Sequence, residues 1–89
     1  MTLDDLKART RNFLSRRKMA YVAIFNGPQG ETVLADLAKF CRATETTFHT
    51  DPRAHAVLEG RREVWLRIQQ NLNLTPDQLW KLVGRPDLD

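Results

Sequence analysis

The stretch "LEGRREVWLRI", Leu58–Ile68, decides the fold class, because its apolar residues recur at the spacing of an α-helix. At about 100° per residue, one face of such a helix is shared by Val57, Leu58, Val64, Trp65 and Ile68. Arg61 points into the middle of that face, whereas Arg62 points well to its side. Since an unpaired guanidinium costs several kcal/mol to bury, the position of Arg61 calls for a partner.

We predict that Arg61 is largely buried and forms a structural clamp with Asp36, which lies at the edge of the apolar face of the preceding helix. Other acceptors for Arg61 are Glu45, Asp51 or the open carbonyls at a helix C-terminus. A role of Arg61 in binding a partner is the second interpretation, and a catalytic role is the third. Gly60, in mid-helix, predicts that another helix packs close to it.

Four helices account for the pattern of apolar residues along the chain. The first has Thr2 as its N-cap and runs to Phe25, as one helix or as two joined near Ser15–Lys18. The turn "NGPQG", Asn26–Gly30, separates it from a second helix over about 31–42. A loop over 43–52 leads to a third helix over about 52–71. Thr75 and Gln78 form a capping box that opens a short fourth helix ending before Gly84.

No strand-like alternation interrupts these helices, so the predicted fold is all-α, a compact bundle of three main helices plus a short C-terminal helix. The parts of the chain are then a basic N-terminal helix or arm (1–18), a helical core domain (19–83) and a C-terminal tail (84–89). The predicted core consists of Leu34, Leu37, Phe40, Val57, Trp65 and Ile68.

The composition is that of a folded chain, with 42% hydrophobic and 28% charged residues in a length of 89, which is enough for one domain. The longest apolar run, "MAYVAIF", is far shorter than the roughly 18 residues of a membrane span, and the start of the chain lacks the pattern of a signal peptide. We therefore expect no membrane partner and a location in a cytoplasm. The single cysteine, Cys41, excludes an internal disulfide.

The positive charge is concentrated at the N-terminus. Residues 1–18 carry a net charge of +4, whereas the rest of the chain carries −1. The six bases of this segment are Lys7, Arg9, Arg11, Arg16, Arg17 and Lys18. They are candidates for contacts with nucleic-acid phosphates, and the alternative is a helix face that contacts only water.

The sequence predicts no catalytic, metal or cofactor site. Cys41, His49 and His55 lack the paired spacing of zinc ligands, and no third group is placed to orient a Cys–His nucleophile. The segment "NGPQGE" lacks the Lys-Ser/Thr that follows a phosphate-binding loop. We therefore expect a protein that is not an enzyme.

Leu66 and Trp80 are the candidate partner surface. Leu66 stands on the polar side of the third helix, and Trp80 is a large aromatic residue in the short last helix. Together they would form an oligomer or assembly surface. The alternative is that Trp80 covers the core beside Trp65.

Residues 16–72 resemble a family of small α-helical proteins of short-tailed phages and prophages. The resemblance lies in "RRKMAYVAIFNGPQGETVLADLAKFC" and in "LEGRREVWLRI", with Tyr21 and Phe25, Gly30, "VLADL", Phe40-Cys41 and the Gly-Arg-Arg at 60–62. Such proteins are encoded among portal, capsid and tail genes. The resemblance implies a structural or assembly role, with other phage structural proteins as partners, in the host cytoplasm during assembly and then in the virion. It implies no enzymatic activity and assigns no binding residues.

Overall fold

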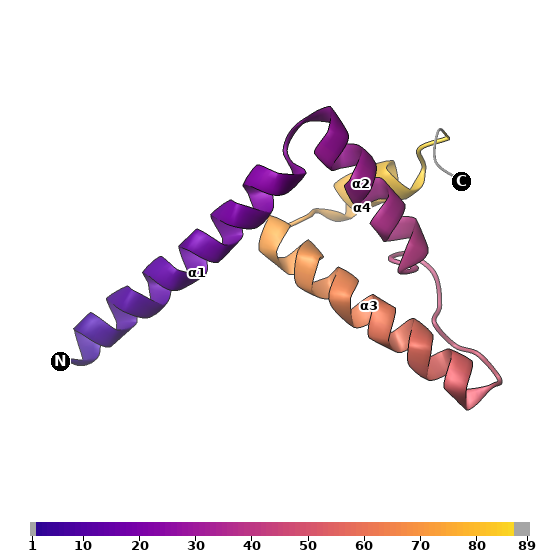
Figure 1. Ribbon diagram of the computed structural model, residues 1–89, viewed down its shortest axis with the longest axis horizontal. Coiled ribbons are helices and arrows are strands. Elements are labelled where there is room, and N and C mark those ends of the chain that lie inside the picture. The colour runs from indigo at the N-terminus through magenta and orange to yellow at the C-terminus, as the bar shows by residue number, and fades with distance from the viewer. Residues whose placement is uncertain (1, 87–89) are drawn as a thin grey trace.

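The described part of the computed structural model contains four α-helices, α1 (Leu3–Phe25), α2 (Gly27–Phe40), α3 (Pro52–Leu72) and α4 (Pro76–Val83) (Figure 1). The structure describes residues 2–86, and within them the side chains of all except residues 10 and 12–14. No strand occurs in the described part of the chain, so the all-α prediction is confirmed. The end of the predicted tail, residues 87–89, lies outside the described residues.

The predicted caps begin their helices. The Thr2 hydroxyl accepts a hydrogen bond from the Asp5 backbone N–H, and the Asp5 carboxylate accepts one from Thr2, which holds the pKa of Asp5 below its ordinary value. Thr75 and Gln78 form the second capping box at the start of α4. α1 is continuous from Leu3 to Phe25, so the chain has one long first helix without a break near Ser15–Lys18.

A single residue, Asn26, joins α1 to α2, and its extended backbone turns the chain between them. The next residue, Gly27, has a φ of +87°, which glycine adopts without strain. Pro28 fits the first turn of α2 because a helix needs no N–H there. The prediction that the turn extends to Gly30 and that α2 starts at residue 31 is therefore wrong. α2 also ends before Arg42, whose φ of +54° is left-handed.

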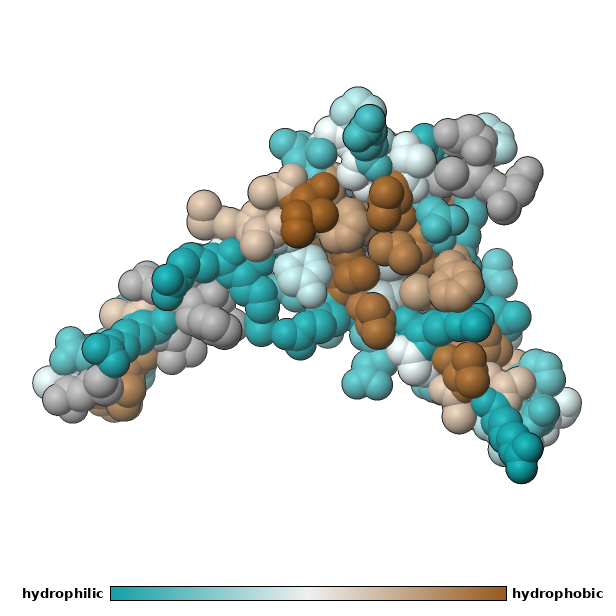
Figure 2. All heavy atoms as spheres, viewed as in Figure 1, coloured by the Kyte–Doolittle hydropathy of each residue, from teal (hydrophilic) through white to brown (hydrophobic). Residues whose placement is uncertain are grey.

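The four helices form an open arrangement rather than the predicted compact bundle. The C-terminal part of α1 lies against α2 and α3, while its N-terminal half projects away from the rest of the chain (Figure 1). The Cα radius of gyration is 16.2 Å, whereas a compact domain of this length has about 12 Å. In the same view, hydrophobic residues gather on the outside of α2 and α3 (Figure 2).

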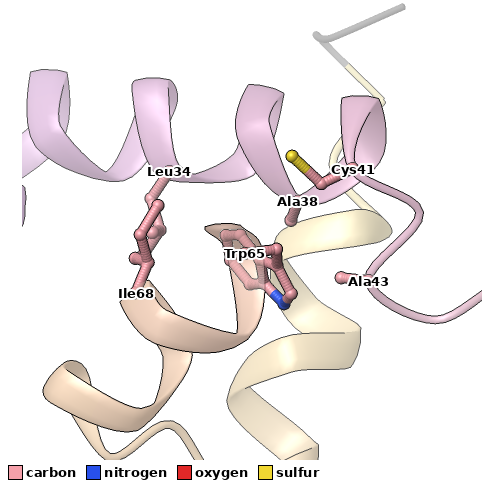
Figure 3. Close-up of a cluster of buried hydrophobic side chains, with 6 residues drawn as sticks. All are labelled: Leu34, Ala38, Cys41, Ala43, Trp65 and Ile68. Atoms are coloured by element: carbon pink, nitrogen blue, oxygen red, sulfur yellow. The ribbon is translucent and has the colours of Figure 1, made fainter. Parts of the chain in front are cut away.

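The core is small and lies where α2, α3 and α4 meet. Leu34 of α2 points at Ile68 of α3, and the Trp65 ring, with an exposed fraction of 0%, lies beside Ala38 and Ala43 (Figure 3). Half-buried residues from α1 and α4 pack around this cluster, among them Tyr21, Phe25, Leu79 and Leu82. The core prediction is confirmed for Leu34, Trp65 and Ile68.

The core prediction is wrong for Phe40 and Val57, whose exposed fractions are 56% and 52%, and Leu37 is only half-buried. The physical reason is that α2 and α3 meet along one edge of each apolar face. Leu34 and Trp65 lie on the covered edges, whereas Phe40 and Val57 lie on edges that face solvent.

Candidate interaction surfaces

The uncovered edges of α2 and α3 carry exposed apolar residues, and we call them the α2–α3 surface. It consists of Val33, Leu37 and Phe40 of α2 and of Val57, Arg61 and Val64 of α3. In both helices these residues follow the i, i+4, i+7 spacing that places side chains on one line. The side of α2 and α3 that carries hydrophobic residues is visible in Figure 2.

Arg61 is exposed, so the prediction of a buried Arg61 is wrong. Its guanidinium carbon lies 4.4 Å from the centroid of the Phe40 ring, a cation–π contact between α3 and α2. Asp36 is also exposed, and no ion pair joins it to Arg61 within the described residues. The guanidinium stays in water because the face on which it lies is covered only along its other edge.

Arg62 connects α3 to the turn that follows α2 through hydrogen bonds. Its Nη1 donates to the backbone carbonyls of Arg42 at 2.8 Å and Glu45 at 2.9 Å. Both carbonyls belong to the turn that follows α2, which ends at Phe40, so they are not the helix C-terminal carbonyls that the sequence offers as acceptors for Arg61. The sequence does contain the signal, since Leu58, Arg62 and Trp65 have the i, i+4, i+7 spacing of the buried line of α3.

The loop between α2 and α3 is fixed to α3 by further polar contacts. The Thr47 hydroxyl donates to the Glu59 carboxylate, and the Thr47 carbonyl lies 2.9 Å from Nδ1 of His55. Gly60 makes no close approach, because a Cβ added there would meet no atom within 4 Å. The predicted packing of another helix at Gly60 is therefore wrong. The neighbouring residues Glu59 and Arg62 make the hydrogen bonds to the loop between α2 and α3.

Five of the six predicted nucleic-acid contacts lie exposed on α1, namely Lys7, Arg9, Arg11, Arg16 and Lys18. Lys7, Arg11 and Lys18 share one line of the helix, and Arg9 and Arg16 lie on the opposite side. Arg17 differs, because it is half-buried and its Nε donates to Oδ1 of Asn71 at 3.2 Å. Arg17 therefore contributes to the contact between α1 and α3.

The projecting half of α1 also carries exposed apolar residues. Leu3 and Leu6 have exposed fractions of 67% and 49%, and they line a shallow hollow with Lys7 and Arg11. Phe13 and Leu14, which continue the apolar spacing in the sequence, have side chains outside the described set. α1 thus presents exposed leucines next to cations, clear of the core.

Leu66 and Trp80 are both exposed, but the structure does not bring them together. Leu66 lies on the outer side of α3, in a hollow with Glu63 and Gln70. Trp80 lines a different cleft, between α4 and the C-terminal end of α2, with Lys39 among its neighbours. The exposed fraction of Trp80 is 63%, so the alternative in which it covers the core beside Trp65 is wrong.

Cys41 and His49, two of the residues considered as metal ligands, have the following surroundings. Burial in the core raises the pKa of the Cys41 thiol above its ordinary value. The positive charge of Arg61 lowers this pKa in part, and the negative charge of Asp36 raises it to a lesser degree. His49 accepts a hydrogen bond at Nδ1 from the Asp51 backbone N–H at 3.0 Å. Within residues 2–86, no three His, Cys, Asp or Glu side chains are grouped to hold a metal ion. None of the described helices has the length and apolar character to cross a membrane.

Comparison with known protein families matches residues 21–84 to the family described as Bbp19-like phage protein. The match starts within α1 and extends to the end of α4, so it includes both helices of the α2–α3 surface. The projecting half of α1, with most of its cations, lies outside the match. Comparison with curated proteins and with solved structures gave no match.

Proposed function

Because the chain belongs to the family of Bbp19-like phage proteins, we propose that it is a non-enzymatic component of the virion or of its assembly that binds other phage structural proteins through its helices. The observation that carries this proposal is the apolar surface left uncovered in so small a chain. At least twelve large hydrophobic side chains are exposed, on all four helices and on the loop before α3. Where such residues adjoin one another, as on the α2–α3 surface, exposed apolar patches mark protein interaction sites.

The distribution of these side chains supports a role as a connector. The α2–α3 surface, the projecting end of α1 and the cleft at Trp80 lie on different elements, so they offer separate contacts to separate partners. The groups that a hydrolytic or redox enzyme would use have other roles. Cys41 is buried in the core, and His55 contacts the loop before α3.

Under this proposal the protein is in the host cytoplasm during assembly and then in the particle. Mass spectrometry of purified virions, compared with that of infected-cell lysate, tests the proposed location. We expect peptides of this chain in virions in a fixed ratio to those of other structural proteins. Detection in lysate alone would exclude a virion component and leave an assembly factor. Normal particle formation after deletion of the gene, with no peptides in the virion, would contradict both roles.

A second candidate function, DNA binding, is favoured by one observation, the line of exposed cations Lys7, Arg11 and Lys18 on α1. If each contacts a phosphate, the affinity for duplex DNA should fall about 40-fold between 50 and 200 mM salt, from a slope near −0.9 per contact. Replacing these three residues with glutamine should abolish a gel shift at low salt.

The matched control for the DNA test replaces three exposed cations of α3 and α4, Arg53, Arg67 and Lys81, with glutamine, which we expect to leave the gel shift unchanged. Arg17 is kept in both variants, because its hydrogen bond to Asn71 belongs to the fold. Equal loss of binding in the two variants would indicate that DNA is attracted by the net charge of the protein alone. If the wild-type protein gives no gel shift, the cations of α1 do not bind DNA, and a protein partner is the remaining proposal for them.

A further inference from the structure

We infer that the α2–α3 surface is the interface of a symmetric dimer of this chain, in which Asp36 of each copy pairs with Arg61 of the other. This inference names one partner for the helix-mediated contacts described above, and to that extent it rests on the proposed function. Three observations carry it: the two charges at the surface, the apolar residues around them, and the excess of exposed area.

The first observation is that an acid, Asp36, and a base, Arg61, both lie exposed at the same apolar surface. Asp36 precedes Phe40 by one helical turn, and the Arg61 guanidinium lies over the Phe40 ring. Both are exposed, and no ion pair holds either of them within residues 2–86. Phe40 is thus flanked by one negative and one positive group.

This charge pattern is complementary to itself under a twofold axis. In a symmetric dimer, if residue i of one copy contacts residue j of the other, then j also contacts i. An axis that passes between Asp36 and Arg61 therefore forms two identical ion pairs, one on each side of Phe40. A surface of one charge sign would instead require a partner of the opposite sign, so the pattern favours a second copy.

The apolar side chains supply the area that such an interface needs. Val33, Leu37 and Phe40 on α2 and Val57 and Val64 on α3 lie beside the two charged groups on the same helices. An interface with an apolar centre and a few desolvated charge pairs is typical of stable protein contacts. Phe40 and Val64, which are exposed in the single chain, would become buried on pairing.

The total exposed area leaves room for this interface. The chain exposes 6870 Å², whereas a compact monomer of its mass exposes about 5400 Å². A standard interface buries about 800 Å² on each partner. The excess, about 1500 Å² by the same scaling, is larger than one partner's share of such an interface.

The test uses two charge-reversal variants, Asp36→Arg and Arg61→Asp, with sedimentation equilibrium over a concentration series. We expect the wild-type chain to dimerise. Each variant alone places like charges opposite one another twice, which should raise the dimer dissociation constant by about 100-fold or more. An equimolar mixture of the two variants should form a heterodimer, because each contact then joins one acid and one base. One of the two contacts is the native Asp36–Arg61 pair, and the other has the two charges exchanged.

The mixture is the decisive arm, since an ion pair inside one chain would be restored in the double variant but never by mixing two chains. Asp77→Arg, the same charge change at an exposed site on α4, is the control and should dimerise like the wild type. Circular dichroism of each variant should show unchanged helix content.

Three results would overturn the inference: a wild-type chain that stays monomeric throughout the series, single variants that dimerise like the wild type, or a mixture that stays monomeric. The virion test is independent of these results. A monomeric protein found in virions would contradict the dimer alone, whereas a dimer that is absent from virions and dispensable for assembly would contradict the proposed function alone.

Discussion

Gly30→Ala should destabilise the protein by about 3 kcal/mol, at the upper end of the range for overpacking. A Cβ at this position would lie 2.5 Å from the carbonyl carbon of Phe25 and 2.7 Å from its Cα and its oxygen. These are backbone atoms, so no rotamer change relieves the clash, and the corner between α1 and α2 must open. Phe25 packs against the core, and its displacement would loosen the packing there.

The matched control is Gly60→Ala, which should stabilise the protein by about 1 kcal/mol because alanine favours a helix interior over glycine. A Cβ at Gly60 meets nothing within 4 Å, and the site is exposed. Thermal unfolding measures both changes, since 1 kcal/mol shifts the midpoint by about 4–8 °C in a domain of this size. Similar midpoints for Gly30→Ala and the wild type would contradict the close approach at the corner.

The features that the sequence predicted correctly are set by local interactions. The capping boxes at Thr2 and Thr75 need only residues three positions apart. The loop between α2 and α3 ends at Asp51, whose side chain accepts a hydrogen bond from the Arg53 N–H. Signals of this local kind are enough to predict that the helices exist and that the fold class is all-α.

The features that the sequence predicted wrongly depend on how far each helix face is covered. Periodicity identified an apolar face on α3, and the prediction assumed that this chain buries all of it. The structure covers the edge with Leu58 and Trp65 and leaves Val57 and Val64 exposed. Both edges are apolar, so hydrophobic periodicity by itself does not show which of them the chain covers.

The candidate sites show the same dependence on tertiary contacts. Arg17 was grouped with the other cations of α1 because charge alone was visible, yet its role depends on Asn71, 54 residues away in the sequence. Asn71 is buried and donates in turn to the Arg67 carbonyl at 2.9 Å. The interruption of the apolar face of α1 at Arg17 is thus explained by a hydrogen bond between α1 and α3.

Arg62→Ala should destabilise the protein by about 3 kcal/mol, because hydrogen bonds from a charged donor contribute about 1.5–3 kcal/mol each. The variant loses both bonds from Nη1 and leaves the carbonyls of Arg42 and Glu45 without that donor. The buried Nε of Arg62 has no hydrogen-bond partner among the described residues, and its removal offsets part of the loss. The estimate therefore stays at the lower end of the sum for two bonds.

Arg61→Ala makes the same chemical change one residue earlier and should destabilise the monomer by less than about 1 kcal/mol, the range for an exposed cation–π contact. Denaturant unfolding at a low protein concentration measures both variants without a contribution from self-association. If the Arg61 variant is as unstable as the Arg62 variant, Arg61 also stabilises the contact between α2 and α3, and the assignment of that role to Arg62 alone is wrong. The expected difference instead assigns stability to Arg62 and leaves Arg61, on the uncovered edge of the same helix, available to a second chain.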